Sequence, residues 1–149
     1  MDEKAKRNQE LGHYLHKTVF LLDKVAEQSL RKNVHIGLSQ FLILLAADKQ
    51  SGLALSQQEI ADHLGINKAA ISRHVDSLVN RELLIRKASI DNRQSNTIVI
   101  TDRGIQLLRK AQLVMRTTMT PHYDAASIGG DANTLLNALK AMHDSLTQP

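Results

Sequence analysis

The chain has 149 residues, of which 42% are hydrophobic and 23% charged, an ordinary balance for one folded domain with its own core. It contains no cysteine, which excludes disulfides and thiol-based metal or redox sites and fits a reducing cytoplasm. The first ten residues are charged and polar, and no apolar run approaches the roughly 20 residues of a membrane span. We therefore expect no signal segment and no membrane partner.

The net charge of +4 is unevenly distributed along the chain. Between residues 67 and 109, eight Lys or Arg stand against four Asp or Glu, so this segment alone has an excess of four positive charges. Such an excess is typical of a phosphate-binding surface, although a solvated basic face has the same composition. Aromatic residues make up only 3% of the chain, which argues against stacking platforms for single-stranded nucleic acid.

Two helices are predicted in the first third of the chain. The first spans about residues 7–32, because apolar or small side chains recur there at alternating steps of four and three, as in a helix packed against other long helices. These positions are Leu11, Leu15, Thr18, Leu22, Val25 and Ser29. The second follows Gly37, with Ser39 as its expected N-cap, and ends before residues 51–52.

The next segment predicts two short helices joined by a tight turn. Ser56 and Glu59 have the spacing of a capping box, which starts a helix over residues 57–64. Gly65 supplies the turn, and Asn67 caps the following helix. In that helix Ile71, Val75 and Leu78 are expected to face inward, and the residues expected outside are Lys68, Ala69, Ser72, Arg73 and Asp76.

This arrangement is typical of a helix-turn-helix, and a hairpin is predicted after it. Close packing of the two short helices needs a small residue, a turn residue and a branched apolar residue, here Ala61, Gly65 and Ile71. Residues 83–87 and 97–100 are predicted strands, and the polar stretch between them should protrude as a wing. Thr101 then caps a long helix that ends at or shortly after Pro121, and a last helix spans residues 132–146.

The chain is therefore predicted to be mainly α-helical with a small β-wing, and the winged helix-turn-helix suggests contacts with double-stranded DNA. The second short helix would enter the major groove, where Arg73 is the best candidate for a bidentate contact with guanine. Its expected DNA-contacting residues are Lys68, Ala69, Ser72 and Arg73, and those of the wing are Asn92, Arg93 and Gln94 in the minor groove. Two acids are expected to support them: Asp91 holds the wing, and Asp76 pairs with Arg73 or Arg93.

The motifs of the middle third resemble those of the MarR-type transcriptional regulators. The resemblance rests on residues 55–61, 72–78 and 84–86, on Asp91-Asn92-Arg93, and on residues 100–104. It implies a single domain over residues 1–149, with the winged part at about 53–101 and dimerisation helices at about 7–36 and 102–147. It also implies a homodimer, whose interface would include Leu11, Leu15, Leu22, Leu135, Leu139 and Met142.

The same resemblance implies a pseudo-palindromic operator with half-sites about 34 Å apart. Most members of the family repress transcription and are released by a small molecule, which binds between the dimer helices and the winged part. The identity of such an effector does not follow from the sequence.

Three other functions fit the sequence less well. An enzyme is not expected, because the chain has no Gly-rich phosphate loop, no metal-ligand cluster and no supported Ser/His/Asp set, and no cofactor is expected either. A winged module that binds protein instead of DNA would place apolar residues where Arg73 and Arg93 stand. A metal-responsive regulator is a minor alternative suggested by His13, His16 and His35, but relatives that sense zinc carry ligands on the fifth helix, and here that helix lacks such histidines before Pro121.

Overall fold

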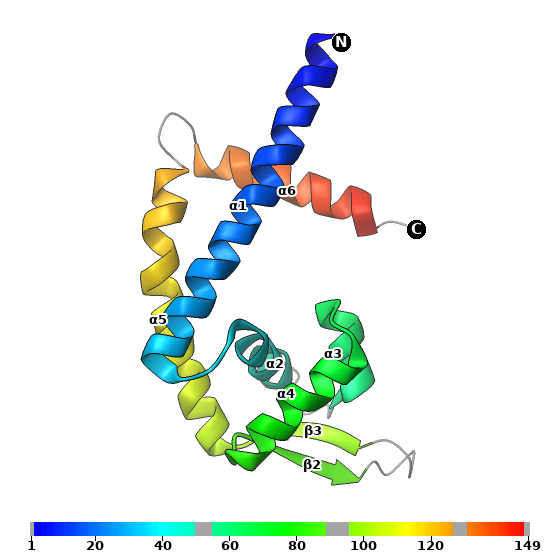
Figure 1. The fold of residues 1–149 in the computed structure, drawn as a ribbon, viewed down its shortest axis with the longest axis vertical. Helices are drawn as coiled ribbons and strands as arrows, with labels where there is room; N and C mark the ends of the chain where they lie inside the picture. Colours follow the sequence, from blue (N-terminus) through cyan, green and yellow to red (C-terminus); the bar gives the residue numbers. More distant parts are fainter. Residues whose placement is uncertain (1, 50–54, 89–95, 127–130, 148–149) are drawn as a thin grey trace.

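The computed structural model describes residues 2–49, 55–88, 96–126 and 131–147, and its fold is mainly α-helical with one small sheet (Figure 1). This confirms the predicted fold class. The elements are α1 (Glu3–Val34), α2 (Leu38–Lys49), β1 (Leu55–Ser56), α3 (Gln57–Leu64), α4 (Lys68–Asn80), β2 (Leu84–Ala88), β3 (Asn96–Ile100), α5 (Asp102–Ala125) and α6 (Ala132–Thr147). Among the described helices, none is both long enough and apolar enough to cross a membrane.

Helix α2 is the centre of the core. It contacts α1, α3, α4, α5 and β3, and it is apolar on most of its circumference, as expected for a helix surrounded by other elements. Its buried side chains are Phe41, Ile43, Leu44, Ala46 and Ala47. The rest of the core is almost entirely aliphatic, in keeping with the scarcity of aromatic residues.

The sheet has three antiparallel strands in the order β1-β3-β2. Leu55 pairs with Ile98 across β1 and β3, and Leu84 pairs with Ile100 across β2 and β3. The two strands of the hairpin were predicted to within one residue at each end. Strand β1 was not predicted, because two residues are too few to show the alternation of a strand.

The predicted N-cap of α2 was wrong. The helix begins at Leu38, so Ser39 lies inside its first turn. Two other side chains accept from the free backbone N–H groups there: Leu38 N donates to Glu27 Oε2 of α1 at 2.5 Å, and Gly37 N donates to Oε1 of Gln40, in the first turn of α2, at 3.1 Å. A carboxylate from the neighbouring helix therefore does what a local serine was expected to do.

The N-terminus of α5 is locked to the base of the hairpin. Thr101 is its N-cap as predicted: its hydroxyl oxygen accepts from Gly104 N at 2.9 Å and donates to the carbonyl oxygen of Glu82 at 2.7 Å. Gly104 is buried, and a Cβ atom on it would lie 2.2 Å from the carbonyl oxygen of Leu83. Only glycine allows this close approach of α5 to the strand.

The outer helices leave apolar side chains uncovered. α6 buries none of its residues, and its Leu139 is 42% exposed. The N-terminal half of α1 lies far from the winged part, at the other end of the molecule (Figure 1), and its Leu11 is 57% exposed. In contrast, the C-terminal end of α1 packs against α5, where the hydroxyls of Ser29 and Thr118 lie 2.7 Å apart.

We predict that Gly104→Ala lowers the free energy of unfolding by about 1–3 kcal/mol, because the added methyl group forces α5 away from the strand. Gly12→Ala is the matched control, since a Cβ on Gly12 of α1 meets no atom within 4 Å. Alanine at that helical position should be neutral or stabilising by up to about 1 kcal/mol. Chemical denaturation measures both, and equal stability changes would contradict the packing described here.

Candidate nucleic-acid interface

Helices α3 and α4 form the helix-turn-helix that the sequence predicts. Both hydrogen bonds of the capping box are present: Glu59 N donates to Ser56 Oγ at 3.2 Å, and Ser56 N donates to Glu59 Oε2 at 2.7 Å. These bonds to the Ser56 backbone and side chain lower the pKa of the Glu59 carboxyl. Gly65 has φ +64° and ends α3, and Ala61 and Ile71 are buried where the two helices meet.

The N-terminal part of α4 presents cationic side chains to solvent. Asn67 caps the helix by accepting from Ala70 N at 2.8 Å. Lys68, Ala69 and Arg73 are exposed and Ser72 is half-buried, as expected from their spacing. Neither Lys68 nor Arg73 makes a hydrogen bond or ion pair with another residue in the described part of the chain. Their charges add to the positive end of the helix dipole, so this end of α4 favours anions.

The partner of Asp76 is Arg86 on β2, which corrects the expectation of Arg73; Arg93, the other candidate, lies outside the described residues. The guanidinium of Arg86 donates from Nη2 to Asp76 Oδ1, and from Nε and Nη2 to Gln57 Oε1 at 3.3 and 3.2 Å. One side chain, 28% exposed, thus joins α3, α4 and β2. It also balances the one acid on the exposed face of α4, so the positive charges there are not cancelled.

The tip of the wing, with Asp91, Asn92, Arg93 and Gln94, lies outside the described residues. At its base, Thr97 Oγ1 donates to the carbonyl oxygen of Lys87 at 3.1 Å. The side chain of Lys87 is exposed and has no ion pair with any residue of the described ranges. Lys87 was not among the predicted DNA contacts, although its position at the outer end of a predicted wing strand could have indicated it.

The orientation of α4 is fixed by bonds to the junction between α1 and α2. Arg81 Nη1 donates to the carbonyl oxygen of His35 at 2.8 Å, and Gln40 Nε2 donates to Ser77 Oγ at 3.1 Å. His35 ends α1 in the left-handed conformation, with φ 57°. α4 is therefore held directly by the end of the long helix α1.

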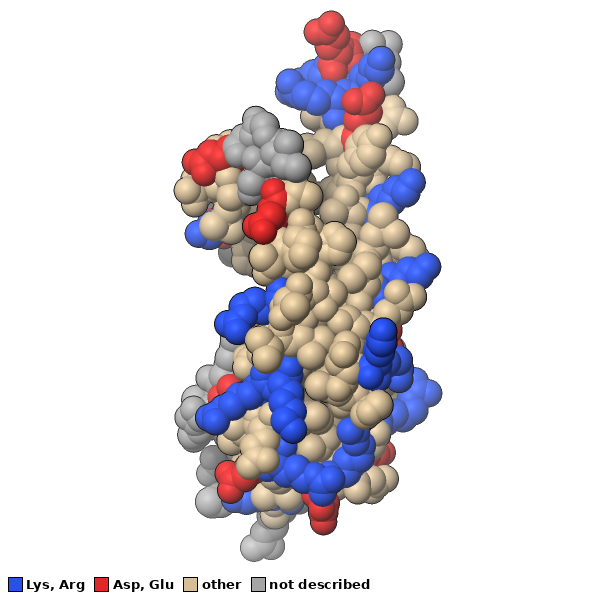
Figure 2. Space-filling view, turned by 90° about the vertical axis from the view of Figure 1, so that its left-hand side faces the viewer, with Lys and Arg blue, Asp and Glu red and all other residues tan. Residues whose placement is uncertain are grey.

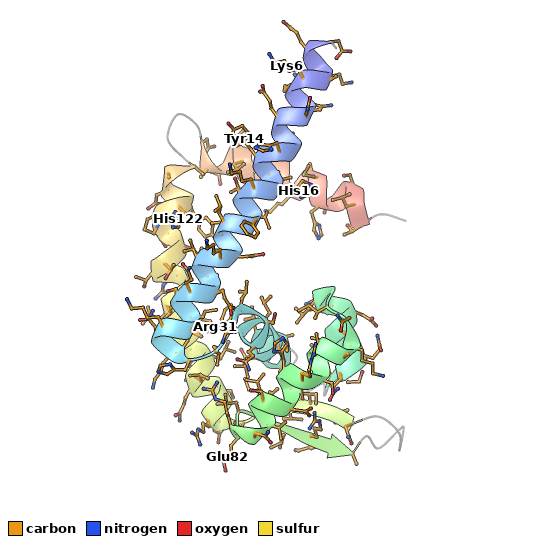
Figure 3. The ribbon with its side chains drawn as sticks, viewed as in Figure 1. Lys6, Tyr14, His16, Arg31, Glu82 and His122 are labelled. Carbon is orange, nitrogen blue, oxygen red and sulfur yellow. The ribbon has the colours of Figure 1, made fainter. Side chains whose placement is uncertain are left out.

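Glu27 lies at the same junction. Burial raises the pKa of its carboxyl, but the N–H of Leu38, the ion pair with Arg31 and the nearby His74 together lower that pKa below its ordinary value. His74 is half-buried and lies within electrostatic reach of Glu27, so this side of α4 faces α1. Figure 3 shows Arg31 at this end of α1.

Positive charge also gathers on the face that carries α1 and α5. There, Lys and Arg side chains cluster over the half of the molecule that holds the winged part, and a few more follow one edge toward the N-terminus of α1 (Figure 2). Arg103, in the first turn of α5, is paired with Glu82 at 2.8 Å on the surface.

A cavity of about 270 Å³ lies between α1, α2 and α5. Its lining is Val19, Leu22, Asp23 and Ala26 of α1, Leu38, Phe41 and Leu42 of α2, and Met115, Met119 and Tyr123 of α5. Within the described ranges, no three His, Asp or Glu side chains lie close enough to hold a metal ion together.

The comparisons with known proteins agree with the helix-turn-helix assignment. Residues 36–95 match the sequence model of the MarR family, which confirms the resemblance indicated by the motifs. A search of curated proteins found no match to this chain.

Several solved structures share the fold. The transcriptional regulator BldR from Sulfolobus solfataricus is 22% identical, with 97% of this chain and 99% of that chain covered and a TM-score of 0.83. The repressor CouR bound to a 23-mer DNA duplex is 23% identical, with 99% of both chains covered and a TM-score of 0.77. A MarR-family regulator from Rhodococcus sp. RHA1 is 19% identical, with 93% of both chains covered and a TM-score of 0.77. All three are described as transcriptional regulators or repressors.

We predict that Arg86→Ala lowers the free energy of unfolding by about 1–2 kcal/mol, because it leaves Asp76 and Gln57 without their shared donor. Arg103→Ala is the matched control, since it removes the same side chain from a largely exposed ion pair and should change stability by no more than about 0.5 kcal/mol. Thermal or chemical unfolding of both variants measures the difference. Equal effects would mean that Arg86 does not join the three elements.

Proposed function

We propose that this chain, whose residues 36–95 match the MarR family, is a transcriptional regulator that binds specific sequences of duplex DNA as a homodimer. The observation that carries the proposal is the exposed end of α4, where Lys68 and Arg73 have no partner among the described residues while Asp76 is balanced by Arg86. A helix end of this kind suits phosphate and base contacts in the major groove. The structure of CouR on duplex DNA is a precedent for the fold.

The proposed contacts are those expected from the motifs. Lys68, Ala69, Ser72 and Arg73 enter the major groove, with Arg73 reaching guanine or a phosphate. Asn92, Arg93 and Gln94 enter the adjacent minor groove, and Asp91 holds the wing. Lys87, at the outer end of β2, adds a further phosphate contact. The winged part spans about residues 53–101.

Dimerisation through α1 and α6 is supported by their exposed apolar faces. A helix of 16 residues that buries none of them, as α6 does, is marginal in water unless it packs against a partner. Its exposed side chains Leu135, Leu139 and Met142 lie on one face at steps of four and three, and Leu11 of α1 is also exposed. The other two predicted interface residues, Leu15 and Leu22, are half-buried within one chain, and Leu22 lines the cavity.

In this proposal residues 7–36 and 102–147 hold two winged parts at a fixed distance. A two-fold dimer reads a pseudo-palindromic site, with half-sites about 34 Å apart when both face the same side of the duplex.

We further propose that the regulator is a repressor released by a small molecule, which binds in the cavity between α1, α2 and α5. CouR, itself described as a repressor, has also been solved with p-coumaroyl-CoA, at 19% identity, a TM-score of 0.79 and coverage of 95% of this chain and 94% of that chain. The proposed location is the cytoplasm, which agrees with the absence of cysteine from the sequence.

DNA binding should depend steeply on salt, with the logarithm of the binding constant falling by roughly 0.9 per phosphate neutralised for each tenfold rise in salt.

Arg73→Ala should weaken binding by about 1–3 kcal/mol if the side chain contacts guanine. Arg7→Ala is the control, because it removes the same charge near the N-terminus of α1, far from α4 (Figure 1). Fluorescence anisotropy with a labelled duplex measures both variants.

Binding that is unaffected by salt, or equal losses in the two variants, would contradict the assignment of α4 as the reading helix. A protein-interaction role for the winged part would then explain the fold better.

The dimer should dissociate when a charge is placed on the apolar face of α6. We predict that Leu139→Glu raises the dimer dissociation constant at least about tenfold, because an unpaired carboxylate would be buried. Asn137→Glu adds the same charge to the opposite side of the helix and should leave the dimer intact. Analytical ultracentrifugation distinguishes the two variants, and a wild-type chain that is monomeric at micromolar concentration would rule out the dimer.

A further inference from the structure

We infer that the cavity between α1, α2 and α5 takes a small organic cation, an apolar group that carries an amine or a quaternary ammonium. The inference names the chemical class of the proposed effector, and its regulatory meaning therefore rests on the proposed function. Its physical basis is the lining of the cavity alone.

The cavity is the right size for a single ring with a short chain. At about 30 Å³ for each water molecule, its 270 Å³ equals roughly nine water volumes. Its deeper wall is apolar, because Ala26 and Phe41 are buried, as is Met119. Such a wall favours the apolar part of a ligand over water.

The single charge in the lining is negative. Asp23 lines the cavity and is also exposed to solvent, so its carboxylate lies at the mouth. It makes no hydrogen bond or ion pair with any other described residue. No lysine, arginine or histidine is among the lining residues. A carboxylate on the ligand would thus meet repulsion and no compensating cation, whereas an ammonium group would meet an unused partner.

The other lining groups also suit a cation. Tyr123 lies at the exposed side, and aromatic rings attract ammonium groups through their electron-rich faces. Met115 and Met119 supply thioether side chains that adapt to the shape of the apolar part. The carboxylate comes from α1, Phe41 from α2, and Tyr123 and the thioethers from α5, so all three helices around the cavity contribute.

The cavity adjoins the junction that holds α4. Leu38 of its lining donates the hydrogen bond to Glu27, the neighbour of the lining residue Ala26, and Gln40 in the same turn of α2 bonds Ser77 of α4. A ligand that moves α1 relative to α2 therefore changes how α4 is held.

The test is isothermal titration calorimetry on the full chain with 2-phenylethylammonium, its neutral counterpart 2-phenylethanol and the anion 3-phenylpropionate. We expect the cation to bind more tightly than the alcohol and the anion to bind most weakly. Asp23→Asn should weaken binding of the cation about three- to tenfold and leave binding of the alcohol unchanged. Glu10→Gln removes one negative charge from the same helix about 20 Å away and should change neither.

The inference is overturned if the cation does not bind, if the anion or the alcohol binds as tightly as the cation, or if Asp23→Asn leaves the affinity for the cation unchanged. DNA binding by the wild-type chain, measured separately, distinguishes this failure from failure of the proposed function. Cation binding by a chain that does not bind duplex DNA would support the site and remove its regulatory meaning.

Discussion

The hydrogen bonds of Arg86 are the constraint on which the proposed DNA-binding surface, the exposed N-terminal part of α4, depends. This guanidinium joins Asp76 of α4 to Gln57 of α3 and extends from β2, so the helix-turn-helix and the sheet are held as one unit. The same bonds balance the carboxylate that would otherwise repel phosphate from α4. Arg86 therefore both holds α3, α4 and β2 together and neutralises the acid on the exposed face of α4. Lys68 and Arg73 are left exposed, with their charges available to a polyanion.

Helix α2 connects this unit to the rest of the molecule. It is surrounded by other elements, and the Glu27 carboxylate of α1 accepts from its first backbone N–H. Arg81 and Ser77 bond the same junction from α4, and the cavity lies against it. A change in the spacing of α1, α2 and α5 therefore reaches α4 through direct contacts. A proposed effector in the cavity would therefore act on the proposed DNA-binding surface through these contacts.

Local signals in the sequence were sufficient for the parts of the fold that form locally. The capping box at Ser56, the turn at Gly65 and the caps Asn67 and Thr101 are each set by residues three or four apart, and all were predicted. The wrong or missing predictions concern contacts between distant residues. The first N–H of α2 bonds Glu27, 11 residues before Leu38, and Ser39 does not cap the helix. Asp76 pairs with Arg86, a strand residue ten positions later.

In the candidate site, too, local features were predicted and contacts between distant segments were not. Periodicity predicted which residues of α4 are exposed, but the cavity is formed by three helices from distant parts of the chain, so no local pattern could reveal Asp23 at its mouth. The exposed faces of α1 and α6 are proposed to contact a second copy of the chain. Contacts between two chains leave no local pattern, so this partner was predicted from the family resemblance alone.

The most direct test of the account is to select the sequences that the chain binds from a pool of random duplexes. The account predicts an enriched inverted repeat whose half-sites lie about one helical turn, 34 Å, apart, since two copies of α4 are related by a two-fold axis. Enrichment of no sequence, or of a single half-site without a partner, would contradict the proposal that a dimer of this chain reads DNA.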